Sequence, residues 1–144
     1  MRRYLLDTSP LAALLHARSA AVALITPWME RHEAATSIVA YAEVVEYIKG
    51  RADFAQRHAH LRTLLGEVYP YFLTYRILER YADLRRSLRP PHGPGLMGDM
   101  DTLIAATALE RHLTVVTIDT DFQRVPDLRV LLLSRSTMEV LSTP

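Results

Sequence analysis

Apolar residues along the chain fall into short runs and into longer stretches spaced like one face of a helix. The short runs predict strands at about 3–6, 33–37, 113–118 and 129–133. The longer stretches predict helices from residue 11, at about 20–31, at 38–48, 52–67 and 77–88, and from 102 to about 111. The aromatic segment 68–75 surrounds Pro70, which favours an edge strand or the start of a strand.

Residues that start and stop helices support this division of the chain. Ser9 and Pro10 are expected to be the N-cap and the first helical residue of the first helix. Ser37 is expected to cap the helix over 38–48, which Gly50 closes. The segment 89–98, RPPHGPGLMG, reads as a loop because it is rich in proline and glycine.

Strands that alternate with helices indicate an α/β fold. We expect a three-layer α/β/α sandwich with a mostly parallel central sheet. The chain has 144 residues, of which 49% are hydrophobic, so we expect one domain over 1–144. In such sheets ligands gather at the carboxyl ends of the strands, which is where functional side chains are sought.

The amino-acid composition excludes several kinds of functional site. The chain has no cysteine, which excludes disulfides, thiolate metal sites and a cysteine nucleophile, so any metal is held by oxygen or imidazole. The formal net charge of +1 does not decide for or against a polyanionic partner. Asp7 and Pro10 interrupt the N-terminal apolar run, and no segment approaches the roughly 20 apolar residues of a membrane span. We therefore expect a cytoplasmic protein with no membrane association.

Aspartates gather where the predicted strands end and a predicted helix starts. Five of the eight aspartates lie at such positions: Asp7, Asp99, Asp101, Asp119 and Asp121. Carboxylates brought together repel one another and resist ionisation unless a cation neutralises them. Mg²⁺ favours carboxylate oxygens together with waters and substrate phosphates, and ions held this way promote phosphodiester hydrolysis. The clustering therefore predicts a divalent metal site.

Simpler explanations exist for several of these acids. Asp7 and Asp99 are both in positions where a carboxylate caps a helix, although Ser9 is better placed than Asp7. An aspartate in a turn after a strand is ordinary, so one of Asp119 and Asp121 can be purely structural, and we favour Asp119 as the functional one.

Three segments in this order resemble the PIN-domain ribonucleases, specifically the VapC-type toxins of bacterial toxin–antitoxin pairs. They are LLDTSPLAALL, AATSIVAYAEVVEYIKG and GDMDTLIAATALERHLTVVTIDTDF. The third is the most specific, because an acid before LIAATAL, a short strand and T-x-D-x-D-F occur together in it. The middle of the chain, about 51–94, matches only in its helical character.

The resemblance implies an endoribonuclease that cleaves RNA with one or two Mg²⁺ or Mn²⁺ ions. It also implies a toxin neutralised by a cognate antitoxin protein, commonly as a homodimer. Carried over by position, the catalytic and metal-binding acids are Asp7, Glu43, Asp101 and Asp119, with Asp99 and Asp121 as less certain additions. Glu46, one helical turn after Glu43, is the alternative for the acid on this helix, but the spacing after Thr36-Ser37 favours Glu43.

Two other interpretations stay open from the sequence. A catalytically degenerate PIN-like scaffold, or a Mg²⁺-binding α/β interaction domain, would carry the same acids without cleaving RNA. A phosphatase of the haloacid-dehalogenase type is less favoured, because Ser9 stands where that class has its second aspartate and Lys49 is the only lysine.

Overall fold

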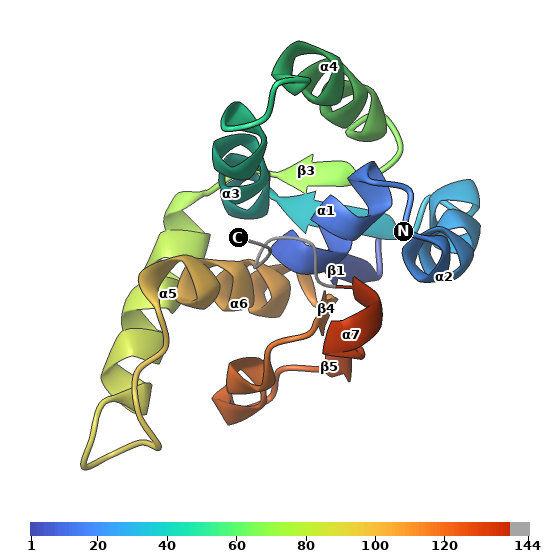
Figure 1. The fold of residues 1–144 in the computed structure, drawn as a ribbon. Helices are drawn as coiled ribbons and strands as arrows, with labels where there is room; N and C mark the ends of the chain where they lie inside the picture. The colour runs from blue at the N-terminus through green and yellow to red at the C-terminus, as the bar shows by residue number, and fades with distance from the viewer. Residues whose placement is uncertain (139–144) are drawn as a thin grey trace.

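The computed structural model describes residues 1–138 and contains one parallel β-sheet between helices (Figure 1). The strands are β1 (Tyr4–Leu6), β2 (Ala34–Ser37), β3 (Tyr69–Tyr71), β4 (Thr114–Thr117) and β5 (Val130–Leu132). The helices are α1 (Thr8–Leu15), α2 (Ser19–Glu30), α3 (Ile38–Lys49), α4 (Phe54–Leu64), α5 (Tyr75–Leu88), α6 (Asp99–Arg111), the 3₁₀ helix η1 (Thr120–Arg124) and α7 (Arg135–Met138). The expected three-layer α/β/α fold is confirmed.

The strand order is β3-β2-β1-β4-β5, and every neighbouring pair is parallel. At the carboxyl end of β1, Leu6 is in register with Thr36 of β2 and Val116 of β4. The residues that follow these strands therefore emerge at one edge of the sheet. β3, which contains Pro70, is an edge strand, one of the two positions expected for this proline, since a proline nitrogen has no hydrogen for a central ladder.

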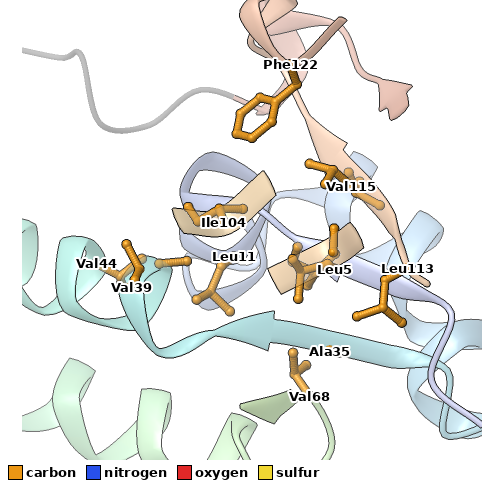
Figure 2. Close-up of a cluster of buried hydrophobic side chains, with 14 of the residues drawn as sticks. Leu5, Leu11, Ala35, Val39, Val44, Val68, Ile104, Leu113, Val115 and Phe122 are labelled. Carbon is orange, nitrogen blue, oxygen red and sulfur yellow. The ribbon is translucent and has the colours of Figure 1, made fainter. Parts of the chain in front are cut away.

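The core lies between the sheet and the helices that cover it. Figure 2 shows side chains from β1, α1, α3 and α6 meeting there, among them Leu5, Leu11, Val44 and Ile104. These four side chains are fully buried, and the apolar burial that they supply is the main favourable term in folding. Leu5 and Leu6 of β1 and Val115 and Val116 of β4 are fully buried, so each strand has apolar side chains on both faces, as expected for a parallel sheet covered by helices on each side.

Two predicted helix starts are corrected by the structure. The first helix begins at Thr8 with Asp7 in the N-cap position, so Ser9 lies inside the helix and does not cap it. The last long helix begins at Asp99 with Gly98 as N-cap, so Asp99 is its first residue and not its cap. The predicted cap of α3 is confirmed, because Ser37 Oγ accepts a hydrogen bond of 3.1 Å from the Val39 amide.

The remaining boundaries differ from the sequence prediction by a few residues. α5 begins at Tyr75, two residues early, because the Thr74 side chain accepts a hydrogen bond from the Ile77 amide. The sequence did not predict α7.

No single helix in the described part of the chain is long and apolar enough to cross a membrane. α1 and α2, which meet at a bend of 100°, reach the required length and apolar character only when they are taken together.

Candidate functional site

Asp7 lies directly after β1, at the edge of the sheet where the strands end. It is only 6% exposed. Its Oδ2 accepts a hydrogen bond of 2.7 Å from the Thr117 hydroxyl, whereas its buried Oδ1 has no hydrogen-bond partner among the described residues. Burial, more than the nearby charges of Glu43 and Asp119, raises the pKa of Asp7 to about 6.

Thr117, the last residue of β4, connects two of the acids. Its hydroxyl donates to Asp7 and accepts a hydrogen bond of 3.0 Å from the Asp119 amide. Asp119 Oδ1 in turn accepts a hydrogen bond of 2.9 Å from the Asp121 amide, which turns the chain into η1. Thr117 is fully buried, so its hydroxyl holds Asp7 and the turn after β4 in fixed positions.

Glu43 reaches the same region from α3. Its Oε1 accepts a hydrogen bond of 2.6 Å from the hydroxyl of Thr8, the residue after Asp7. This contact joins the start of α1 to the middle of α3, across 35 residues of sequence. Nothing in the sequence distinguishes Thr8 from an ordinary helix-start residue, and only the tertiary contact reveals that it orients Glu43.

Asp101 lies in the first turn of α6 and faces the other acids. Its pKa is raised to about 7, first by burial and then by the negative charges of Asp7, Asp119, Glu43 and Asp121. Because each of these carboxylates acts on Asp101, the acids that follow β1 and β4 and those on α3 and α6 lie near one another. Their role as a metal site stays a prediction.

Two of the six candidate acids are neutralised by arginine. Asp99 Oδ1 accepts a hydrogen bond of 2.9 Å from the Tyr81 hydroxyl and lies 3.3 Å from Arg85 Nη1. Asp121 Oδ1 lies 3.1 Å from Arg124 Nη2. Among residues 1–138, the other four have no basic side chain within ion-pairing distance, and they are Asp7, Glu43, Asp101 and Asp119.

The four unpaired carboxylates suit a hard divalent cation by their chemistry. The buried Asp7 Oδ1 without a hydrogen bond is costly unless a cation lies against it. Within the described residues, however, no three acidic or histidine side chains are placed to hold one ion directly, and Glu43 Oε1 is directed at Thr8. Mg²⁺ characteristically binds one or two carboxylates directly and keeps several waters, so this arrangement fits such an ion.

A cavity of about 360 Å³ adjoins the acids. Its lining residues come from the start of α1, from α3 and from the first turn of α6, and they are Thr8, Ala42, Glu43, Glu46, Tyr47 and Met100. Thr8 and Glu43, which are hydrogen-bonded to each other, belong both to this cavity and to the acidic site. Sequence reasoning identified neither the cavity nor Met100.

Three arginines of α5 form ion pairs with acidic residues of α6. Arg76 and Arg80 both pair with Glu110 of α6, at 3.0 and 2.8 Å. Arg85 pairs with Asp99. In the structure these three side chains therefore join α5 to α6.

A sequence comparison matches residues 4–128 to the PIN domain family. No curated protein matches the sequence. Solved structures with the same fold include VapBC2 from Rickettsia felis bound to a promoter DNA fragment, with TM-score 0.79, 20% identity and coverage of 91% of this chain and 98% of the other. For DNA-bound VapBC from Salmonella typhimurium the TM-score is 0.80 and the identity 17%, with coverage of 91% of this chain and 98% of the other. For VapBC-1 from nontypeable Haemophilus influenzae the TM-score is 0.76 and the identity 23%, with coverage of 90% and 96%.

Proposed function

The chain belongs to the PIN domain family, and on that premise we propose that it is a metal-dependent endoribonuclease that hydrolyses RNA phosphodiesters. One observation carries the proposal: within residues 1–138, four carboxylates without basic partners lie near the strand-end edge of the sheet, and a buried oxygen of one of them accepts no hydrogen bond from these residues. A structural cluster of acids would be expected to carry compensating arginines, as Asp99 and Asp121 do.

In this proposal Asp7 and Asp101 are the direct ligands of Mg²⁺ or Mn²⁺. The bound ion supplies polarisation of a phosphoryl oxygen and activation of water for in-line attack. Glu43 binds the ion or a water through its Oε2, while Thr8 holds Oε1. Asp119, fixed by its amide hydrogen bond to Thr117, completes the site. Water is the nucleophile, so no side chain becomes covalently attached to RNA.

Cleavage of an end-labelled, unstructured RNA tests this activity. We expect cutting by the native chain with Mn²⁺ or Mg²⁺, none with excess chelator and none by Asp7→Asn. Asp83→Asn is the matched control, because Asp83 is an exposed aspartate of α5 outside the acidic site. If the native chain binds the metal but never cuts RNA, the degenerate scaffold is correct and the nuclease proposal is wrong.

We further propose that the chain is the toxin of a toxin–antitoxin pair. The support is the likeness in fold to chains of VapBC structures and to one described as a toxin–antitoxin complex from Klebsiella pneumoniae. Expression of the native chain alone should stop bacterial growth, and co-expression of the product of the adjacent reading frame should restore it. Growth arrest by Asp7→Asn equal to that by the native chain would contradict the proposal.

A homodimer is the third part of the proposal. Large apolar side chains are exposed beside the edge strand β3 and along the start of α5, at Tyr69, Phe72, Tyr75 and Leu78. Tyr75 is 87% exposed and Phe72 is 64% exposed, and large apolar side chains left exposed in one segment are a feature of interaction surfaces. We call these four residues the β3–α5 surface and assign it to contact with a second copy of the chain.

A further inference from the structure

The cavity beside the acids, which we call the α3 pocket, differs in character from the acids themselves. Ala42, Tyr47 and Met100 give it largely apolar walls. Met100 is 44% exposed although it is apolar, and it lies next to Asp101 in the first turn of α6. An apolar wall at this position is not needed to hold a metal ion or a phosphate, so it indicates a second ligand group.

The aromatic wall of the pocket, the Tyr47 ring, packs against a neighbouring ring. The Tyr47 ring lies edge-on to the ring of His16, with centroids 5.8 Å apart and planes at 64°. A ring fixed in this way offers a flat apolar contact without losing much rotational freedom on binding. Aromatic and thioether side chains beside a phosphodiester site are suited to an unstacked nucleobase.

Glu46 is the polar group of the pocket that the proposed metal site does not use. It is exposed on α3 one turn after Ala42 and has no ion-pair partner among the described residues. A free carboxylate beside bound RNA repels the phosphates, and hydrogen bonds that it accepts from the ligand offset this cost. Its presence therefore favours a base whose edge carries donors.

Among the four RNA bases, guanine fits a carboxylate best. Its Watson–Crick edge presents two adjacent donors, N1–H and the N2 amino group, which can both bond to one carboxylate. Adenine and cytosine place an acceptor beside their amino group, and uracil has one donor between two carbonyl oxygens. An acceptor facing a carboxylate is repelled, so the other three bases bind less well.

We propose that the α3 pocket binds the guanine of the nucleotide next to the scissile phosphate, with Glu46 accepting hydrogen bonds from N1–H and N2–H and with Tyr47 and Met100 contacting the base. This inference rests on the proposed function, since it places the scissile phosphate at the acids. Continuity between the two sites supports it, because Thr8 and Glu43 line both. The pocket would then make the nuclease select guanine at one position of its cut site.

Sequencing of the product ends of a long unstructured RNA tests the selectivity. We expect the native chain with Mn²⁺ to cut about tenfold or more faster where guanine occupies one fixed position beside the cut. Glu46→Gln should reduce that preference to roughly threefold or less. Ala42→Leu, which fills the pocket, should have the same effect. Glu79→Gln, on the exposed part of α5, is the matched control and should keep the native preference.

Nucleotide binding gives a second readout that does not need cleavage. In protein labelled with ¹³C at the methionine methyl groups, the signal that disappears in Met100→Leu identifies Met100. With Ca²⁺ present, guanosine 5′-monophosphate should shift this signal at lower concentration than the adenosine, cytidine or uridine monophosphates. Glu46→Gln should remove the difference.

The outcomes separate this inference from the proposed function. Metal-dependent cutting without a guanine preference, or an unchanged preference in Glu46→Gln, would overturn the guanine pocket and leave the nuclease in place. Guanosine monophosphate shifting Met100 in a chain that never cuts RNA would support the pocket and overturn the nuclease. Arginine amide serves as a probe for a basic side chain of a protein ligand. If the Met100 signal responds to arginine amide but to no mononucleotide, the pocket binds a protein and the guanine proposal is wrong.

Discussion

The hydroxyl of Thr117 donates a hydrogen bond of 2.7 Å to Asp7 Oδ2, although the two residues are 110 positions apart in the sequence. The pairing follows from the sheet, because β1 and β4 are neighbours in parallel register and Asp7 and Thr117 stand at their carboxyl ends. The same hydroxyl accepts from the Asp119 amide, so one buried side chain orients two of the proposed metal-binding acids.

Thr117→Val tests this role with a side chain of similar shape and no hydroxyl. We expect metal affinity and RNA cleavage to fall about 10- to 100-fold, the usual effect of removing a group that orients a metal ligand. Thr117→Ser keeps the hydroxyl and should recover most of the activity. Equal activity in Thr117→Val and native protein, measured at saturating and at limiting Mn²⁺, would show that Asp7 does not depend on this hydrogen bond.

Asp99 and Asp101 form a matched pair of aspartates in the first turn of α6. Asp101→Asn should reduce metal-dependent cleavage about 100-fold or more, because it removes a proposed direct ligand. Asp99→Asn should reduce cleavage only a few fold, since it breaks the exposed contacts to Arg85 and Tyr81. Initial rates at one Mn²⁺ concentration compare the two variants, and the reverse order would reassign the ligand.

The metal-free protein should lose stability as the pH rises. The pKa of Asp7 is about 6 in the folded chain against 3.8 when unfolded, so the folded state binds the proton more tightly. Its carboxyl therefore destabilises the fold progressively between about pH 4 and pH 6 and fully above that range. Relative to Asp7→Asn, the free energy of unfolding of the native chain should fall by on the order of 3 kcal/mol from pH 4 to pH 8.

Urea unfolding of both proteins with chelator at the two pH values measures this difference. Using Asp7→Asn as the reference cancels the titrating groups that do not interact with Asp7, such as His16, whose pKa is lowered by burial and whose effect on stability has the opposite sign. Asp101 does not cancel, because the charge of Asp7 contributes to raising its pKa, and this coupling adds to the difference in the same direction. Mn²⁺ should restore stability to the native chain at pH 8 more than to the variant. A difference that grows in favour of the native chain as the pH rises, without metal, would contradict this electrostatic interpretation.

From the β3–α5 surface we predict that the chain is a dimer in solution. The double variant Phe72→Ser and Tyr75→Ser should convert a dimer into a monomer, which light scattering after size exclusion would show. Leu132→Ser, at an exposed apolar position on the opposite edge strand, is the control and should leave the mass unchanged. If the double variant has the native mass in solution, the chain does not dimerise through this surface.

The sequence predicted the order of the strands and helices along the chain with few exceptions, because short apolar runs and capping residues such as Ser37 act locally. It placed the first N-cap at Ser9, since a serine before proline is a common helix start, whereas the helix begins at Thr8 directly after the strand. Pro70 left two positions open, an edge strand or the start of a strand, and β3 is an edge strand. The strand order could not be predicted from local pattern, since it depends on contacts distant in sequence.

The convergence of the acids was predictable because carboxyl ends of parallel strands meet at one edge. The division of the acids into paired and unpaired groups was not predicted. Arg124 lies only three residues after Asp121, a local pair, whereas Arg85 lies on α5 and only the fold brings it to Asp99. The roles of Thr8 and Met100 were hidden for the same reason: each depends on a partner that is far away in the sequence.

A crystal of the native chain grown with Mn²⁺ and measured at the manganese absorption edge tests most directly whether the unpaired acids bind a metal. The anomalous map should contain a peak within about 2.5 Å of Asp7 Oδ1 and of a carboxylate oxygen of Asp101, with Glu43 and Asp119 bound directly or through water. A map without a peak between these side chains at millimolar Mn²⁺, in crystals that show ordered carboxylates, would contradict the metal site and the nuclease activity proposed from it.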